Sequence, residues 1–550
     1  MIFNIIRKIT GIERETDKPG VSGGIKYAAD ILLFIVVSFY LIATGVLLPL
    51  YLPSYDSLGS DKGKFWISVI KISGKMLLVP LALYVLSFIV AFVKDKPASG
   101  NLREYISKKV KIYPSDIWAA VFCVNVIISR ALSDEKEIAL YGERGWYVGM
   151  VSYLALGLAA IIVPRLGKAK NYFLPVIMAG SFAVCLLGIL MDLKGNVLHA
   201  EGWYGGRIST IGNSNWFCGY LITVMFCGAA AFFLRKEKKG LGSKALNALL
   251  VIYMTLAFYM IIGQGSASAY PALFAVILAL MIISGKDLKA LFKVVLIILT
   301  GCLGTFLHAI QIVCGGYSRT NDALGLLLEK PSVVLGIAAV FAGVTALIFI
   351  RIKKEKTQAK VNIGLVLTAL TGISLLIFIL LLIANTGSGV GYLGKEGSVF
   401  WFCDEWGAHR GATMKAGWAL FKEMTPVEKL FGVGPDNFYS FTMCGRNDET
   451  ALFVIEYFNG ARLTNAHCDP LTMLVNTGLI GAVSYYGLMI CVMIKGFKKK
   501  NITALSCSLG ILAYIINNIF SFQTAVNVSQ LALVLAFGAW AVTHDKSEDR

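Results

Sequence analysis

Long apolar runs alternate with short polar connectors along almost the whole chain. A run of roughly 20 apolar residues is long enough to cross the hydrocarbon core of a bilayer as an α-helix. With 57% hydrophobic residues and a mean hydropathy of +0.70, the chain lies outside the range of soluble domains, so we expect an all-α integral membrane protein. About fourteen spans are expected, near residues 27–50, 66–93, 115–131, 146–163, 172–190, 210–234, 245–262, 268–284, 290–313, 332–350, 361–384, 471–494, 502–520 and 526–543.

Charged residues predict the orientation of these spans. The connectors that are rich in Lys and Arg are 94–111, 165–170, 235–244, 286–293, 351–360 and 495–500. They alternate with neutral or acidic connectors, so the positive-inside rule places them and both termini in the cytoplasm. The same rule explains the net charge of +18 without nucleic acid, because the basic residues form no single face. Residues 1–26 show no cleavable signal pattern, so we expect the first span to be retained.

The segment 385–470 is long but neither strongly apolar nor a basic connector. With fourteen spans, it becomes one large extracytoplasmic loop. We expect no separate soluble domain and divide the chain into three regions: an N-terminal bundle of about five spans (1–200), a region that includes the loop (201–495), and two C-terminal spans with a cytoplasmic tail (496–550).

Two lysines in the second expected span, Lys71 and Lys75, lie one helical turn apart and therefore on one face. An ammonium group inside a bilayer is costly, so it either extends to the headgroups or faces a cavity. Lys71 lies near the outer edge, which favours the headgroups. For Lys75, snorkelling and a place in a substrate-binding cavity both stay open.

Arg207 lies at the outer end of the sixth expected span, and Asn213 and Asn215 follow within the first turns of the helix. A guanidinium can hold a phosphate through two parallel hydrogen bonds, and a helix N-terminus adds free N–H groups. The three residues are therefore candidates for binding a phosphorylated substrate. The alternative is an arginine at the lipid headgroups beside asparagines that cap the helix.

The long loop contains a predicted helix and a candidate base. Four residues at helical spacing predict an amphipathic helix on the membrane surface: Arg410, Met414, Trp418 and Phe421. His467 lies where the chain re-enters the membrane, close in sequence to Arg462. An imidazole that titrates near neutral pH can act as a general base. The alternative is a histidine that only forms hydrogen bonds within the loop.

Eleven cysteines are scattered through spans and loops without the spacing of metal ligands, so we expect no zinc or iron–sulfur site. Cys403 and Cys444 in the long loop could pair as a disulfide in an oxidising compartment, with Cys468 left over.

Three blocks, in this order, resemble the O-antigen ligase/polymerase family of bacterial membrane glycosyltransferases. They are GRISTIGNSNWFCGYL at 206–221, HRGATMKAGWALFKEMTPVEKLFGVGPDNF at 409–438 and RLTNAHCDPLTMLVNTGLIGAVSYY at 462–486. The likeness runs from Arg207 to Tyr486, about half the chain, and includes the large outer loop.

This resemblance implies a GT-C-type fold in the bacterial cytoplasmic membrane. Members of the family move a glycan from a polyprenyl diphosphate to an acceptor sugar on the outer face, without a metal or a nucleotide. The resemblance further implies that Arg207 and Arg410 bind the lipid diphosphate and that His467 acts on the acceptor. This is physically coherent, because guanidinium groups can stabilise the negative charge that develops on a pyrophosphate leaving group.

Two positions depart from the family pattern. Ser266-Ala267-Ser268 stand where the family often has Ser-Arg-Gly, so one arginine is missing. Lys75 or Arg462 could supply this charge, which makes both of them candidate substrate-binding residues. Cys468 follows the histidine where the family commonly has Asn.

The function expected from the sequence is metal- and cofactor-independent polymerisation or ligation of lipid-linked cell-surface polysaccharide. Its expected partners are a polyprenyl-diphosphate-linked glycan donor, a glycan or lipid-linked acceptor, membrane lipids and polysaccharide-assembly proteins, but not nucleic acid. The rival is a lipid-linked oligosaccharide flippase or other transporter. Repeat halves and carboxylates within the spans would indicate a transporter, and we find neither in the sequence. An inactive scaffold in an assembly complex is a third alternative.

Overall fold

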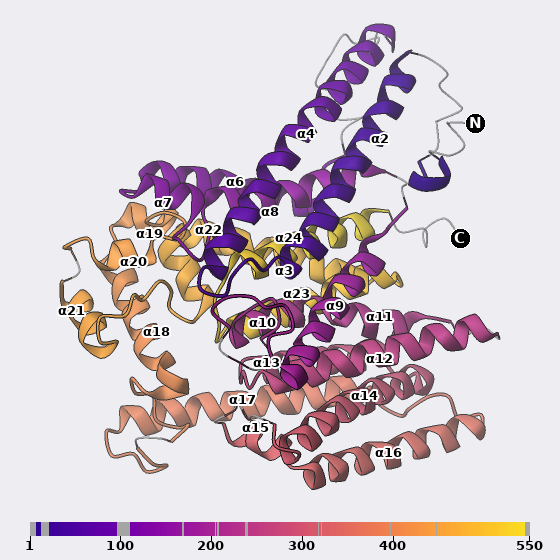
Figure 1. The fold of residues 1–550 in the computed structure, drawn as a ribbon, viewed down its shortest axis with the longest axis vertical. Helices are drawn as coiled ribbons and strands as arrows, with labels where there is room; N and C mark the ends of the chain where they lie inside the picture. Colours follow the sequence, from indigo (N-terminus) through magenta and orange to yellow (C-terminus); the bar gives the residue numbers. More distant parts are fainter. Residues whose placement is uncertain are drawn as a thin grey trace.

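The computed structural model of the chain describes residues 7–12, 21–95, 111–167, 170–203, 205, 208–236, 240–316, 318, 320, 322–395, 398–446 and 448–544. In those residues the secondary structure is helical, with two isolated β-bridges and no β-strand (Figure 1). The expected class, an all-α multi-pass membrane protein, is confirmed.

The helices, in chain order, are α2 (Val21–Ile42), the π-helical turn η1 (Ala43–Leu47), α3 (Leu48–Leu50), α4 (Leu58–Asp95), α6 (Pro114–Leu132), α7 (Lys136–Tyr141), α8 (Met150–Ile162), the 3₁₀-helix η2 (Val163–Leu166), α9 (Phe173–Lys194), α10 (Ser214–Val224), α11 (Phe226–Leu234), α12 (Leu241–Gly263), α13 (Ala269–Ser284), α14 (Leu288–Val313), α15 (Ala323–Leu328), α16 (Pro331–Lys353), α17 (Ile363–Gly387), α18 (Trp406–Glu423), α19 (Pro426–Phe431), α20 (Phe438–Thr442), α21 (Asp448–Tyr457), α22 (Asp469–Phe497), α23 (Ile502–Asn518) and α24 (Ala525–Thr543).

Within the described residues, 11 helical segments are long and apolar enough to cross a membrane. Each coincides with one of the expected spans. The other three expected spans coincide with shorter apolar helices, at Met150–Leu166, Ala269–Ser284 and Ile502–Asn518. The total of fourteen crossings and the cytoplasmic side of the termini therefore stay predictions.

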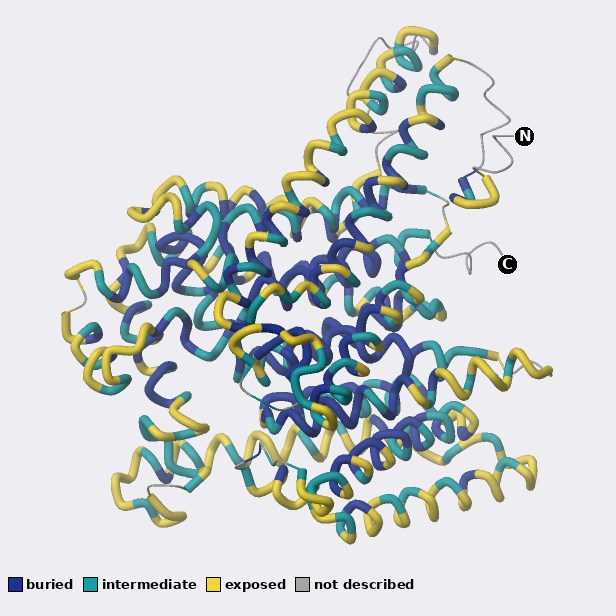
Figure 2. Tube along the Cα trace, in the orientation of Figure 1, coloured by how far each residue is buried: buried dark blue, intermediate teal, exposed yellow. Residues whose placement is uncertain are grey.

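Helix α24 is the centre of the bundle. Sixteen of its nineteen residues are buried, among them Asn527, Ser529 and Gln530, and it packs against α8, α10 and α23. The peripheral helices α16 and α17 each bury only two residues, and Figure 2 shows them mostly exposed. A helix that faces lipid must be apolar on nearly every side, whereas one enclosed by protein can carry polar side chains.

The long loop folds as a helical module. Helices α18 to α21 lie at the left of Figure 1, while the first turn of α2 and the last turn of α24 lie on the right. The module has its own apolar core, which it shares with the start of α22 and which includes Leu420, Phe438, Val454, Leu463 and Val475. Helices α18 and α19 also pack on α22. The module is therefore docked on the spans through buried apolar contacts.

A buried lysine positions the turn between α3 and α4. The Lys62 ammonium donates hydrogen bonds to the carbonyls of Leu48, Pro49 and Tyr51, at 2.8, 3.0 and 2.7 Å. These carbonyls lie at the C-terminal end of a short helix, where a cation is favoured. The Thr210 hydroxyl donates to the same Pro49 carbonyl at 2.7 Å. The segment before α10 is thereby held against the start of α4.

Candidate active site

The fold brings Arg410 and His467 together at the base of the helical module. Arg410 begins the regular part of α18, and His467 lies two residues before α22. The Arg410 Nε donates to the Phe520 carbonyl at 2.8 Å, and its Nη1 donates to the Gly407 carbonyl at 2.7 Å. The guanidinium is also close enough to the imidazole for its charge to affect the pKa of His467. These two predicted catalytic residues therefore share one site.

His467 is held in an unusual conformation with an unused ring nitrogen. Its φ is 47°, in the left-handed region, and its backbone N–H donates to the Asn465 Oδ1 at 3.0 Å. The ring packs edge-on against Phe522, with centroids 4.9 Å apart. Among the described residues, the buried His467 Nδ1 has no hydrogen-bond partner. The sequence alternative of a loop histidine held by side-chain hydrogen bonds therefore does not describe this nitrogen.

The environment keeps the His467 imidazole neutral. Burial is the larger cause and the Arg410 charge the second, and together they lower the pKa of His467 from 6.5 to about 4. Both disfavour the protonated form, since burial penalises a charge and a neighbouring cation repels one. At neutral pH the ring is therefore unprotonated and able to accept a proton.

The backbone before Arg410 is strained. Gly407, Ala408 and His409 have φ values of 62°, 58° and 66°, so the chain turns left-handed before the helix that starts at Arg410. Such runs persist only where the surroundings hold them, and they cluster at functional sites. Gly411 adds a constraint, because a Cβ there would lie 1.8 Å from the Cys403 carbonyl oxygen.

The predicted amphipathic helix is present, with one face on the protein. Ala416 and Leu420 are buried in the core of the module. Trp418 is 50% exposed and stacks on Phe421, with ring centroids 5.7 Å apart. Phe421 is itself partly buried against the core of the module, so a position of this helix on the membrane surface stays a prediction.

The loop between α23 and α24 completes the site, and the sequence analysis missed it. Phe520 and Phe522 supply the carbonyl on Arg410 and the ring on His467. Gln523 fixes this loop to α22 and α8. Its Nε2 donates to the Asp469 Oδ1 at 2.6 Å, and its Oε1 accepts from the Tyr153 hydroxyl at 2.9 Å. The polar and aromatic residues at 520–524, between two apolar spans, are the sequence feature that could have pointed to this loop.

A row of aromatic rings leads from His467 to a cavity. Phe522 contacts Trp146 at 5.2 Å between centroids, and Trp146 contacts Trp216 at 5.6 Å. Trp216 lines a cavity of about 470 Å³, together with Arg144 and Asp56. The cavity lies where the start of α4, the start of α10 and the connector before α8 meet.

Asn213 and Asn215 have structural roles beside this cavity. The Asn213 Oδ1 caps α10 by accepting from the backbone N–H groups of Asn215 and Trp216. Asn213 also lines the cavity. The Asn215 Oδ1 accepts from the Ser266 hydroxyl at 2.8 Å. The capping alternative is therefore confirmed for Asn213, and substrate contact by either amide stays a prediction. Arg207 lies outside the described residues.

Arg462 has a partner within the protein. Its Nη2 lies 3.1 Å from the Glu143 Oε1, and its guanidinium lies 4.3 Å from the centroid of the Tyr439 ring. Close by, burial raises the pKa of Asp436 to about 7. The backbone N–H groups of Val148 and Glu143 donate hydrogen bonds to this carboxylate and partly oppose that rise. Arg462 therefore fastens the module to the connector before α8, a role the sequence analysis missed.

Lys75 does not reach the site. Its side chain is exposed on α4, and α4 pairs mainly with α2, in a hairpin that extends away from the other spans in Figure 1. Lys71 lies 4.8 Å from the centroid of the Tyr141 ring. Lys75 therefore lies outside the site that Arg410 and His467 form, and its place in a substrate-binding cavity stays a prediction.

The structure bears on the disulfide considered for the long loop and, separately, on the residues that could bind a metal ion. Cys403 and Cys444 are free thiols, so the disulfide considered from the sequence is not formed. In the part of the chain that the structure describes, no group of three or more His, Cys, Asp or Glu side chains is arranged to hold a metal ion.

No protein-family model matches the sequence, and no curated protein matches it. The chemistry must therefore be argued from the site. It combines a fixed guanidinium, a neutral imidazole with an unused nitrogen, and a nearby cavity that contains polar and aromatic groups. Such a set can bind an anionic group and remove a proton from a hydroxyl.

Proposed function

We propose that this protein transfers a glycan from a polyprenyl-diphosphate donor to an acceptor sugar at the outer face of the bacterial cytoplasmic membrane, as a polymerase or a ligase. The observation that carries the proposal is the pairing of Arg410 with a neutral His467 that has an unused nitrogen. The two residues are far apart in sequence, lie in separate blocks of the resemblance, and meet where a membrane span begins.

The proposed reaction is a displacement at the anomeric carbon of the donor. The acceptor hydroxyl oxygen forms the new glycosidic bond while its proton passes to the His467 imidazole. The bond between the anomeric carbon and the diphosphate oxygen breaks, and its electron pair stays on the diphosphate. Arg410 stabilises that charge through its guanidinium.

Binding of the donor would also tune the base. A diphosphate beside Arg410 offsets the guanidinium charge, which is one of the two causes that lower the pKa of His467. The pKa therefore rises when the donor is bound, and the imidazole becomes a stronger base at that moment. A general base contributes typically about 10²–10⁴-fold to a rate.

The cavity of about 470 Å³ offers room for the glycan. The Trp216 ring provides an apolar platform, while Arg144 and Asp56 provide a donor group and an acceptor group for hydroxyls. An amphipathic aromatic surface with a few polar groups suits a sugar, which has both apolar faces and hydroxyl edges.

The transporter alternative rests on charges within the spans. The structure corrects the expectation that spans lack carboxylates, because such helices contain Asp30, Asp61, Asp116, Asp192 and Asp469. All of them except Asp30 lie at helix ends. Asp30 lies in the first half of α2, where it accepts a hydrogen bond from the Tyr84 hydroxyl. A charged site near the midplane would favour a transporter. These positions favour the enzyme instead.

The test is a transfer assay on protein reconstituted in nanodiscs, with a polyprenyl-diphosphate-linked oligosaccharide as donor and product mass as readout. We expect His467→Ala to bind the donor but transfer it about 10²–10⁴-fold more slowly. Arg410→Ala should lose donor binding, and Arg410→Lys should be impaired because an ammonium cannot make two parallel hydrogen bonds. His199→Ala and Arg446→Lys, outside the site, are the matched controls.

Near-parental turnover by His467→Ala would remove the base assignment, and inhibition by EDTA that a divalent ion reverses would contradict metal-independent transfer. The glycan profile of cells that lack the protein separates the remaining functions. Short lipid-linked units indicate a polymerase, unattached long chains a ligase, and accumulation on the cytoplasmic side a flippase.

A further inference from the structure

A second polar pocket, of about 230 Å³, lies at the other end of α22 from the candidate active site. It is enclosed by the segment before α6, the end of α22 and the end of α24. Helix α22 has 29 residues with a kink at Gly478, so the pocket lies up to about 40 Å from Asp469. That length equals about the thickness of a bilayer with its headgroups. If α22 crosses the bilayer as expected, the pocket comes to headgroup level on the face opposite the helical module.

Three lysines line this pocket, Lys111, Lys495 and Lys499, and none of its lining residues in the described part of the chain carries a carboxylate. Lys111 and Lys495 have no ion-pair partner among the described residues. The Lys111 ammonium lies 5.5 Å from the centroid of the Tyr113 ring. Like charges around one small pocket repel one another unless an anion joins them, and here at least the ammonium groups of Lys111 and Lys495 lack an ion-pair partner among the described residues.

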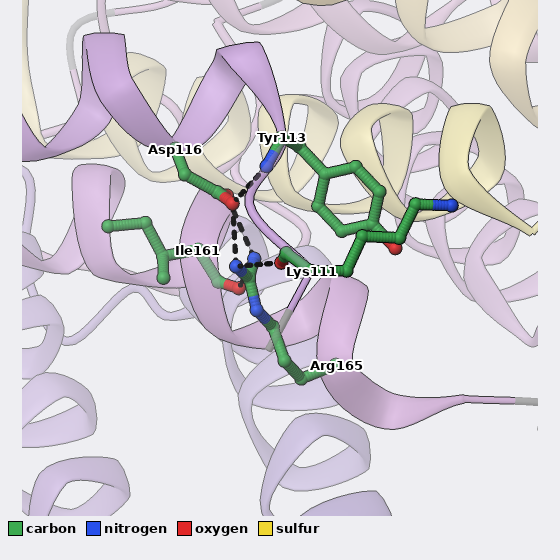
Figure 3. A network of polar contacts seen from close by, with 5 residues as sticks. All are labelled: Lys111, Tyr113, Asp116, Ile161 and Arg165. Atoms are coloured by element: carbon green, nitrogen blue, oxygen red, sulfur yellow. Dashed lines mark hydrogen bonds and ion pairs between the residues drawn. The ribbon is translucent and has the colours of Figure 1, made fainter. Parts of the chain in front are cut away.

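The carboxylate nearest in sequence is already neutralised. Arg165 donates to both oxygens of Asp116, at 2.8 and 2.6 Å, and the Tyr113 N–H donates to the same carboxylate at 2.7 Å. Figure 3 shows the guanidinium enclosed by Asp116 and the carbonyls of Ile161 and Lys111, while the Lys111 side chain extends away from this network. Asp116 therefore cannot offset the lysine charges.

A nearby histidine responds to this positive field. His544 follows α24, and its ring stacks on Trp540 with centroids 5.4 Å apart. Burial is the main cause that lowers the pKa of His544. The hydrogen bond with the Trp540 carbonyl acts in the opposite direction, and the Lys111 charge, a smaller cause, lowers the pKa further. The lysine charge is thus felt at the end of α24, beside the Thr543 that lines the pocket.

The rest of the lining is apolar on the side of the spans. Val492, Ala539 and Val542 belong to α22 and α24 and continue into the bundle, while the lysines lie at or beyond the helix ends. We infer that this pocket binds a phosphate group, presented by an anionic membrane lipid or supplied as free phosphate. An ammonium cluster beside an apolar wall suits a lipid phosphate with its glycerol backbone. This inference does not depend on the proposed glycosyl transfer.

The test compares three forms of the full-length protein in neutral detergent micelles. They are the parent, the variant Lys111→Gln/Lys495→Gln/Lys499→Gln, and a control that removes three exposed lysines outside the pocket: Lys354→Gln/Lys498→Gln/Lys500→Gln. One arm measures retention of dioleoylphosphatidylglycerol by native mass spectrometry. The other measures the effect of inorganic phosphate on the unfolding temperature, against sodium chloride at equal ionic strength.

Each lysine near an anionic headgroup contributes about a fivefold factor to affinity, so we expect the pocket variant to bind roughly 100-fold more weakly. The control variant should lose far less, and the single variant Lys495→Gln should lose about fivefold even if the triple variant expresses poorly. Lysine-dependent binding of the lipid alone identifies a headgroup site, and lysine-dependent stabilisation by phosphate alone identifies a site for the free ion. Equal losses in the pocket and control variants, or no lysine-dependent binding in either arm, would overturn the inference.

Discussion

The electrostatic link between Arg410 and His467 can be tested by removing the charge of the arginine. In Arg410→Gln the pKa of His467 should rise, because one of the two causes that lower it is lost. Burial and the Arg410 charge together lower the pKa of His467 from 6.5 to about 4, and burial is the larger cause. The midpoint should therefore move up by about one pH unit or less, which corresponds to about 1.4 kcal/mol.

The titration can be followed by site-resolved modification with diethyl pyrocarbonate, which reacts with the neutral imidazole. The fraction of peptide modified at His467 is measured by mass spectrometry across pH 3.5–7.5 (about four pH units, a range that brackets the ordinary pKa of histidine). The control is Arg446→Gln, since Arg446 pairs with Glu428 at 2.8 Å, outside the site. An unchanged profile in Arg410→Gln, or an equal change in Arg446→Gln, would refute the direct coupling.

The lowered pKa of His467 also makes the stability of the folded protein depend on pH. Its folded-state pKa lies below the ordinary value, so the unfolded chain binds the proton first as pH falls from 6.5 toward 4. His467 therefore removes stability in that window and has no such effect above it.

Three further outcomes are expected. The pKa of Asp436 is raised from 3.8 to about 7, so the folded protein keeps a proton that the unfolded chain releases. The free energy of unfolding therefore falls as pH rises through this window, by up to about 4 kcal/mol. In unfolding scans at pH 4 and pH 8, Asp436→Asn should remove this loss. Gly411→Ala should abolish transfer and lower the yield of folded protein, because its Cβ would overlap a carbonyl oxygen, whereas Gly372→Ala, with nothing within 4 Å, should do neither. A cysteine label at Lys356 should react only from the cytoplasm and one at Asn459 only from outside; reaction of both from one side would contradict the expected topology.

Local pattern was enough to predict the class and most element positions. Apolar length identified each helix that is long enough to cross a membrane, because a span must satisfy its backbone internally and face lipid with apolar side chains. Helical spacing likewise predicted α18, and position relative to an apolar run predicted Asn213 as a possible cap. These features depend on residues close together in the chain.

The faces of the helices could not be predicted in this way. Both α17 and α24 are apolar enough to cross a membrane, yet the first is exposed and the second lies at the centre. The polar residues of α24 fit an enclosed helix, but they do not say which helices enclose it. Lys75 shows the consequence, since a lysine on a span looks the same in sequence whether its face points to a cavity or away from the bundle. Which face is enclosed depends on how distant helices pack, and spacing within one helix carries no record of that.

The composition of the candidate site depends on the same long-range packing. His467 and Arg410 could be named from their residue types and from the resemblance, but their closeness, the ring of Phe522 and the anchor at Gln523 come from segments that meet only after folding. The low pKa of His467 follows from that assembly, because burial and a neighbouring cation are properties of the packed site. Residue type and local periodicity specify which groups are present, and the distances between them exist only once the spans have packed.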